Sequence, residues 1–132
     1  MLVRADIYDR NCPSRQVLDR IGDTWSVLVV ASLAHGAQRY TQLARRIGGV
    51  SPKMLTQTLR ALERDGLISR TVHAAVPPRV DYALTDLGRS LLRLVGALEE
   101  WAETHMDDVL AARETYDTGA REIKAQALRS QA

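Results

Sequence analysis

Hydrophobic residues recur three or four positions apart over most of the chain, and this spacing predicts a mainly helical protein. The first helix is expected over residues 14–21, with Val17, Leu18 and Ile21 facing inward. Residues 25–36 follow and are apolar on nearly every side, a pattern typical of a helix at the centre of a core. We therefore expect this second helix to be a central element of the core.

Residues 51–65 are expected to form a helix with two contrasting sides. Ser51 is a good N-cap because its hydroxyl can accept a hydrogen bond from a free backbone N–H, and Pro52 suits the first helical position. Gly66 suits the left-handed residue that often ends a helix. One stripe is formed by Leu55, Leu59 and Leu62. The opposite stripe carries cations and one amide, namely Lys53, Gln57, Arg60 and Arg64.

Two interpretations of the cationic stripe are open at this point. Most helices of soluble proteins have a charged outer face that contacts only water. A solvated face usually mixes both signs of charge, however, whereas Glu63 and Asp65 lie off this stripe. The alternative is a surface that binds an anionic partner.

A shorter helix is expected over residues 42–47, with Thr41 as its N-cap and the turn Gly48–Gly49 after it. A short helix, a turn containing glycine and a second helix form the helix-turn-helix pattern. The second helix of such a unit lies in the DNA major groove, where Lys and Arg can bond to guanine and Gln to adenine. The candidate DNA-binding residues of this region are Arg45, Arg46, Ser51, Lys53, Thr56, Gln57, Arg60 and Arg64.

Residues 68–84 are expected to form a β-hairpin, because polar and apolar side chains alternate in both halves of this segment. Its tip, residues 76–79, contains two prolines, which cannot donate to a strand ladder. A hairpin directly after a recognition helix is the wing of a winged helix. Arg79 at the tip is either a DNA contact or an ordinary polar turn residue.

Residues 86–112, capped by Thr85, are expected to form one long helix with two apolar strips. One strip can cover the winged domain, and the other is free for dimerisation; alternatively, both pack within one chain. The candidate dimerisation residues are Leu91, Leu94, Leu98, Trp101 and His105. We expect a winged-helix domain with flanking dimerisation helices over residues 1–112. A polar C-terminal extension, helical or frayed, is expected over residues 113–132.

Composition and charge narrow the class of protein. The chain has 132 residues, of which 45% are hydrophobic, and this is enough for one domain with an extension. It has one cysteine and no long apolar run, so a cytoplasmic protein without a membrane span is expected. Residues 39–70 contain seven Lys or Arg and two acids, whereas residues 99–117 contain seven acids and one Arg. An anionic partner is therefore expected at the basic half.

Four segments in order resemble the HxlR-type winged helix-turn-helix regulators, which are neighbours of the MarR group. They are CPSRQVLDRIGDTWSVLVVASLAHGAQRYTQL, IGGVSPKMLTQTLRALERDGLISR and VPPRVDYALTDLGRSL, with ALEEWAETH after them. The resemblance covers about residues 12–105. It implies an α+β fold, mainly helical with a small hairpin and a long C-terminal dimerisation helix. It also implies a bacterial transcription factor that binds an inverted-repeat operator as a dimer.

The pair Cys12-Pro13 matches a position at which some members of that family sense oxidants or electrophiles. Arg10 and Arg15 lie close in sequence, and Cys12 precedes an expected helix N-terminus. Positive charge and the helix dipole both lower the pKa of a thiol. Cys12 is therefore a candidate sensor, and the alternative is a small thiol with a packing role.

The other classes of function find little support in the sequence. The three histidines are scattered without metal-ligand spacing, and the chain lacks a Gly-rich phosphate loop. We therefore expect no enzyme, no catalytic or metal-binding residue and no cofactor. Expected partners are double-stranded operator DNA, a second copy of the chain, and a small-molecule effector or electrophile. Two alternatives to a thiol sensor are open, a winged-helix dimer with a non-covalent effector and an interaction module that does not bind DNA.

Overall fold

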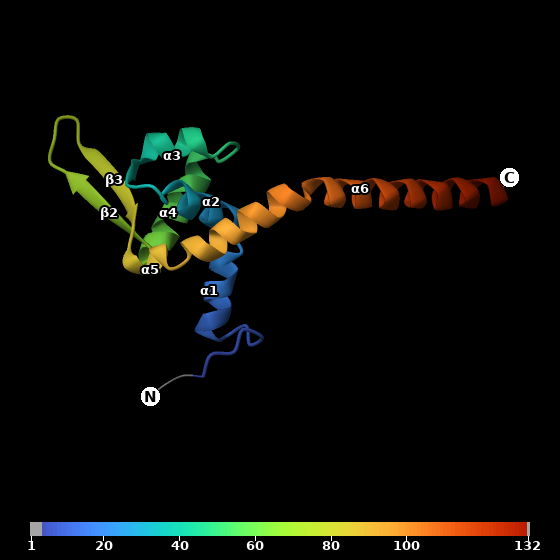
Figure 1. Ribbon diagram of the computed structural model, residues 1–132, viewed down its shortest axis with the longest axis horizontal. Coiled ribbons are helices and arrows are strands. Elements are labelled where there is room, and N and C mark those ends of the chain that lie inside the picture. Colours follow the sequence, from blue (N-terminus) through green and yellow to red (C-terminus); the bar gives the residue numbers. More distant parts are fainter. Residues whose placement is uncertain (1–3, 132) are drawn as a thin grey trace. The chain divides into compact units, whose positions relative to one another are not determined.

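The computed structural model describes residues 4–131, and the chain divides into two compact units between Val95 and Gly96. The first unit contains helices α1 (Pro13–Ile21), α2 (Thr24–Ser32), α3 (Tyr40–Arg46), α4 (Pro52–Arg64) and α5 (Asp86–Arg89), as Figure 1 shows. Its strands are β1 (Gln38–Arg39), β2 (Ile68–His73) and β3 (Arg79–Leu84). Helix α6 (Leu92–Ser130) begins in this unit and forms the second one.

The core of the first unit lies where α2, α3, α4 and the hairpin pack together. Helix α2 contacts both α3 and α4, as expected of a helix that is apolar on nearly every side. Each fully buried leucine stabilises this packing by roughly 1.5–3 kcal/mol. The core residues are Val29, Val30, Leu33, Leu43, Ile47, Leu55, Leu59, Leu62, Leu67, Ile68, Leu84 and Val95.

The elements confirm the predicted winged helix-turn-helix. Helices α3 and α4 are joined by the turn that contains Gly48 and Gly49, and the hairpin of β2 and β3 follows α4. The three strands form an antiparallel sheet in the order β1-β3-β2. Gly66 has φ of 75° and ends α4 in the predicted left-handed conformation.

The predicted single helix over residues 86–112 is wrong. The structure has the four-residue helix α5, a tight turn through Ser90 and Leu91, and then the 39-residue helix α6. Ser90 Oγ donates a hydrogen bond to the Leu87 carbonyl, and the Leu91 N–H donates to Gly88 three residues back. Both bonds are accepted by backbone carbonyls only three residues back in a tightened turn. The regular helix therefore ends with α5 and begins again with α6. Helix α6 continues through residues 113–130, where the sequence left extension or fraying open.

Two predicted helix ends are also wrong. Helix α3 begins at Tyr40 rather than after Thr41, and the Gln42 side chain accepts a hydrogen bond from the Arg39 N–H at 2.8 Å. Helix α2 ends at Ser32, short of residue 36. The Gln38 amide donates to the Ser32 carbonyl at 2.6 Å, so a side chain satisfies one of the last carbonyls of the helix.

The inward orientation predicted for two residues of α1 is not observed. Val17 and Leu18 are 53% and 46% exposed, while Ile21 is half-buried. The helix is tied to the unit at its last turn, where Arg20 Nε lies 3.0 Å from Asp65 Oδ2 at the end of α4. Its first two turns are therefore held less closely than the sequence pattern suggested.

Candidate nucleic-acid interface

Helix α4 separates an apolar side from a cationic side, as its sequence predicted. Ser51 Oγ accepts a hydrogen bond from the Met54 N–H at 3.1 Å, and Pro52 occupies the first helical position. The buried side consists of Leu55, Thr58, Leu59 and Leu62. The stripe of Lys53, Gln57, Arg60 and Arg64 is exposed along the whole helix. The leucines fix the rotation of α4, and this rotation directs the cationic stripe to the surface.

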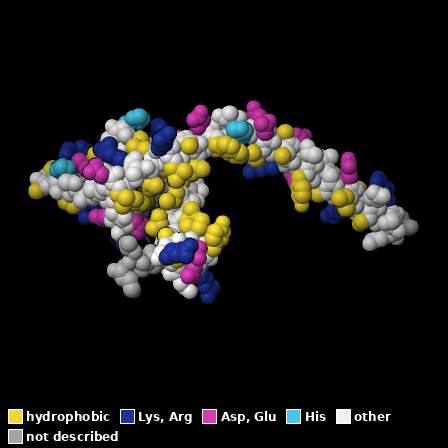
Figure 2. Space-filling model, turned by 60° about the horizontal axis from the view of Figure 1, so that its bottom comes forward, with side chains coloured by type: hydrophobic (Ala, Val, Ile, Leu, Met, Phe, Trp, Pro, Cys, Tyr) yellow, Lys and Arg dark blue, Asp and Glu magenta, His cyan; other side chains and the backbone are white. Residues whose placement is uncertain are grey.

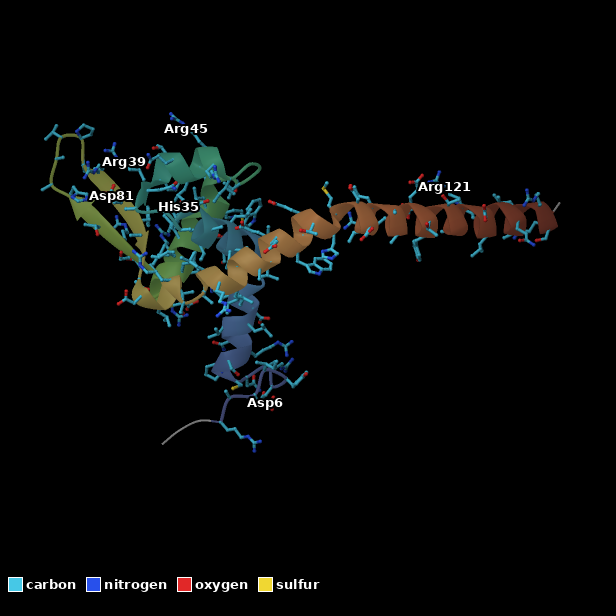
Figure 3. All side chains as sticks on the ribbon, in the orientation of Figure 1. Asp6, His35, Arg39, Arg45, Asp81 and Arg121 are labelled. Atoms are coloured by element: carbon cyan, nitrogen blue, oxygen red, sulfur yellow. The ribbon has the colours of Figure 1, made fainter. Side chains whose placement is uncertain are left out.

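The remaining predicted DNA-binding residues of the helix-turn-helix differ in exposure. Arg45 and Arg46 are exposed in the last turn of α3, and Figure 3 shows Arg45 pointing away from the fold. Thr56 is half-buried, so it offers less surface to a partner than Lys53 or Gln57.

Three residues that the sequence analysis missed line a hollow beside α4. Tyr40, Arg70 and Tyr82 surround it together with Thr56, Leu59, Arg60 and Glu63. Arg70 and Tyr82 are paired across β2 and β3, and the Tyr40 hydroxyl donates to the Pro52 carbonyl at 3.2 Å. The hollow thus brings one further group that can bond to phosphate, Arg70, next to Arg60. Period-two alternation in both strands could have placed Arg70 beside Tyr82, but only with a known hairpin register.

The position of Arg79 in the wing differs from the one that the sequence predicted. This residue is the first of β3, paired with His73, rather than a free residue of the tip. The half-buried carboxylate of Asp81 lies 2.9 Å from His73 Nε2, 3.5 Å from Arg79 Nε and 4.0 Å from Arg39 Nε. Arg39 and Asp81 lie close together in Figure 3. One acid therefore holds three basic side chains of the wing and of the neighbouring strand β1.

The predicted dimerisation residues belong to two environments. Leu91 is half-buried and packs against the core of the first unit, whereas Leu94 is 48% exposed. In the second unit, Leu98 and Trp101 are 47% and 58% exposed. The rings of Trp101 and His105 stack with centroids 4.6 Å apart, and His105 Nδ1 lies 2.9 Å from the Trp101 carbonyl oxygen.

Cys12 is the N-cap of α1, as predicted, and is buried under the segment that precedes it. Its sulfur lies 3.1 Å from Ser14 Oγ and accepts a hydrogen bond from the Asp6 N–H at 3.4 Å. These two bonds lower the pKa of the Cys12 thiol, with a further contribution from the Ser14 backbone, while burial and the Asp9 charge oppose them. The causes are hydrogen bonds, rather than the arginine charges that the sequence suggested.

Neither a metal-binding cluster nor a membrane-spanning helix occurs in the described part of the chain. Residues 4–131 contain no group of three or more His, Cys, Asp or Glu side chains placed to hold a metal ion. None of the helices described there is long and apolar enough to cross a membrane.

Comparison with known proteins identifies similar regulators. Residues 20–109 match the model of a family described as HxlR-like helix-turn-helix. The uncharacterized HTH-type transcriptional regulator YtfH of Escherichia coli K12 is 43% identical over 113 residues, which cover 86% of this chain and 90% of YtfH. The structure of ytfH from Salmonella typhimurium has a TM-score of 0.79 at 43% identity, covering 84% of this chain and 99% of that one. The redox regulator HypR in its oxidized form has a TM-score of 0.66 at 38% identity, covering 70% and 96%.

Proposed function

This chain belongs to the HxlR-like helix-turn-helix family of transcriptional regulators, and we propose that it binds an inverted-repeat operator as a homodimer in the bacterial cytoplasm. The observation that carries this proposal is the exposed cationic stripe of α4, which lies opposite a buried leucine stripe. A helix fixed in this way can enter the major groove without leaving the core.

The residues of the stripe have different roles in this proposal. Lys53, Gln57 and Arg60 contact base edges, with Thr56 beside them, because Lys and Arg pair with guanine and Gln with adenine. A second set contacts phosphates and fixes the register of the protein on the duplex. This second set consists of Arg45, Arg46, Ser51, Arg64 and Arg79.

The proposed homodimer uses the apolar face of α6. An inverted repeat presents the same half-site twice, so a two-fold dimer can place one recognition helix on each half. The residues proposed for this contact are Leu94, Leu98, Trp101 and His105 on α6, with Leu91 in the turn just before the helix. Exposed leucine and tryptophan side chains on one helix face are typical of such contacts.

We further propose that Cys12 is the sensor of this regulator and responds to oxidants or electrophiles. Two observations support this role, the lowered pKa of its thiol and the similarity of the chain to the redox regulator HypR. Because the chain has one cysteine, a disulfide has to join two chains or involve a small thiol; otherwise the product is an adduct or a sulfenic acid. The competing candidate is a regulator that binds a non-covalent effector.

The experiment that tests DNA binding is a fluorescence anisotropy titration with the DNA upstream of the gene for this protein. We expect tight binding to the labelled upstream DNA. Unlabelled upstream DNA should compete for the protein effectively, and unlabelled random DNA of equal length should compete poorly. The double variant Gln57→Ala, Arg60→Ala should lose roughly 1–3 kcal/mol per base contact, because its direct contacts are gone.

A matched control is Arg121→Ala, which removes one exposed cation from α6 and should bind like the wild type (Figure 3). Unchanged operator affinity of the double variant would contradict the roles of Gln57 and Arg60. Equal affinity of the wild type for upstream and random DNA would instead favour an interaction module without specific DNA binding.

A further inference from the structure

A second hollow in the first unit lies between α1 and the turn that joins α5 to α6, and its lining residues differ from those of the hollow beside α4. Its volume is about 160 Å³. Hydrophobic side chains gather on the surface of the first unit in Figure 2. We call this feature the α1 hollow. Its apolar walls are Val17 and Ile21 of α1, Leu67 after α4, Leu87 of α5 and Leu91 of the turn.

The α1 hollow accounts for the position of Val17. The spacing of apolar residues in α1 predicted that Val17 faces the core, and its side chain lines this hollow instead. Val17 and Leu87 are 53% and 57% exposed and form the rim, whereas Leu67 is 8% exposed and forms the floor. Removal of such apolar surface from water is favourable. An apolar molecule in the hollow would therefore be held by both the rim and the floor.

The polar groups that line the α1 hollow are bonded to one another or to the backbone. Arg20 Nε donates a hydrogen bond to Asp65 Oδ2 at 3.0 Å, and Ser90 Oγ donates to the Leu87 carbonyl. The charges of Arg20 and Asp65 offset each other, so this pair presents no net charge to a ligand. A charged ligand would lose its hydration without gaining a partner of opposite sign. The hollow is therefore suited to a neutral molecule.

We propose that the α1 hollow binds one neutral, apolar molecule with a single ring, of the size of benzene or toluene. An apolar cavity of about 150 Å³ accommodates one benzene molecule, and the α1 hollow has a similar volume. Pockets for larger, drug-sized ligands measure roughly 300–1,000 Å³. The inference goes beyond the proposed function, because it assigns a ligand that is held without a covalent bond. It uses neither Cys12 nor the DNA-binding residues.

A bound ring would fasten α1 to the first unit at a second point. Helix α1 is held at its last turn by the ion pair of Arg20 with Asp65. Val17 lies one turn earlier, so a molecule between Val17 and Leu87 joins the middle of α1 to α5. A ligand that binds only the folded form stabilises that form. Local opening of α1 should therefore become rarer when the ligand is bound.

A titration of the full chain with toluene, followed through the methyl NMR signals, gives the first test. The signals of Leu67, Leu87 and Leu91 should shift and reach saturation together. Leu110 and Leu128 provide an internal control, because they are 50% and 61% exposed on α6 and do not line the hollow. Equal shifts at Leu110 and Leu128 would show adsorption to exposed leucines and overturn the proposal, as would the absence of any shift.

Two substitutions in α1 separate the hollow from other exposed apolar surface. Val17→Trp places a large ring at the rim of the hollow, so the dissociation constant of toluene should rise at least tenfold. Leu18→Trp is the matched control, since Leu18 is 46% exposed on the same helix but does not line the hollow. In this control the dissociation constant should change less than twofold. Circular dichroism checks that both variants remain helical.

Leu87→Asp tests the opposite wall. It places a carboxylate at the rim, which a bound ring would have to strip of water, so the dissociation constant of toluene should again rise at least tenfold. Unchanged toluene binding in both Val17→Trp and Leu87→Asp would overturn the proposal. A higher dimer dissociation constant of the same two variants in sedimentation equilibrium would then assign the hollow to contact with a second copy of the chain.

Charged molecules with the same ring test the class of ligand. Benzoate and benzylammonium should each bind at least tenfold more weakly than toluene, because the ion pair of Arg20 with Asp65 leaves no net charge to receive them. Binding of benzoate as tight as that of toluene would assign the hollow to anions through Arg20. That result would overturn the assignment to a neutral ligand.

Amide hydrogen exchange tests the effect on α1. Saturation with toluene should slow the exchange of the amides of residues 17–21 in the wild type and leave it unchanged in Val17→Trp. Unchanged exchange in the wild type would overturn the proposed attachment of α1 through the ligand. Because no measurement in this series contains DNA or an oxidant, failure of this proposal and failure of operator binding or of the Cys12 response are separate results.

Discussion

Arg79 Nε lies 3.5 Å from Asp81 Oδ1, so a wing cation proposed to contact DNA is held by an acid of its own strand. The same carboxylate lies 2.9 Å from His73 Nε2. Ion pairs this exposed contribute only about 0–1 kcal/mol to stability. The larger effect of Asp81 is on the orientation and the net charge of the wing.

We predict that Asp81→Asn strengthens non-specific DNA binding and lowers the preference for the operator. The change removes a negative charge that competes with phosphate for Arg79, and it frees the arginine to move. The slope of log affinity against log salt should become steeper by up to about one, the value for one added phosphate contact. Anisotropy titrations from about 50 to 200 mM salt measure this slope.

Asp19→Asn is the control for this prediction, because it removes an equal charge from an exposed position on α1. If Asp19→Asn changes the salt slope as much as Asp81→Asn does, the effect comes from net charge and not from the wing.

The wing also shows where the sequence stops being informative. Alternation identified both strands of the hairpin, and the leucine stripe identified the outer face of α4. Strand β1, however, has only two residues, too few for a period, so the contact of Arg39 with Asp81 could not be foreseen. The hollow beside α4 likewise depends on the register between Arg70 and Tyr82, which no local pattern fixes.

Gly88 should not tolerate a side chain, because α5 approaches the backbone of Leu67 there. A Cβ at this position would collide with the Leu67 carbonyl oxygen. Gly88→Ala should therefore cost roughly 1–3 kcal/mol of unfolding free energy, as overpacking typically does. Urea denaturation measures the loss.

The matched control for Gly88→Ala is Gly96→Ala. Gly96 lies in α6, and a Cβ there meets nothing within 4 Å. That variant should gain about 0.5–1 kcal/mol from helix propensity. A stable Gly88→Ala protein would show that α5 can move away from the sheet.

Ser51→Ala should destabilise the first unit by about 1 kcal/mol, because α4 loses the side-chain acceptor at its N-terminus. Thr41→Ala is its counterpart, since Thr41 was predicted to cap α3 but lies inside the first turn of that helix. Thr41→Ala should change the unfolding free energy by no more than about 0.5 kcal/mol. A loss at Thr41 as large as that at Ser51 would contradict these assignments.

The break between α5 and α6 marks another limit of sequence analysis. The 3-4 spacing of apolar residues continues from Leu87 to Leu94, so periodicity alone predicts one helix. A tertiary contact accompanies the interruption, because Gly88 of α5 lies close to the backbone of Leu67, which is far away in the sequence. Tertiary contact of this kind overrides local propensity.

The pKa of the Cys12 thiol should lie below that of an ordinary thiol, chiefly because of the bond with Ser14. The rate of iodoacetamide alkylation, measured against pH, gives this pKa directly because the chain has one cysteine. Ser14→Ala should shift the profile to higher pH. A lowered folded-state pKa also means that the thiolate stabilises the fold above the unfolded pKa, and this stabilisation is lost as pH falls through the folded value.

Oxidation or alkylation of the Cys12 thiol should change the affinity of the protein for its operator. Modification of Cys12 breaks its bonds with Ser14 and Asp6, which hold the preceding segment over the start of α1. If that segment contributes to the dimer, the two recognition helices move relative to the operator, and a change of about 1.4 kcal/mol alters binding tenfold. Operator affinity is to be measured before and after diamide or a quinone, for the wild type and for Cys12→Ser. We expect a response in the wild type alone, and equal responses in both proteins, or none in either, would leave Cys12 with a packing role.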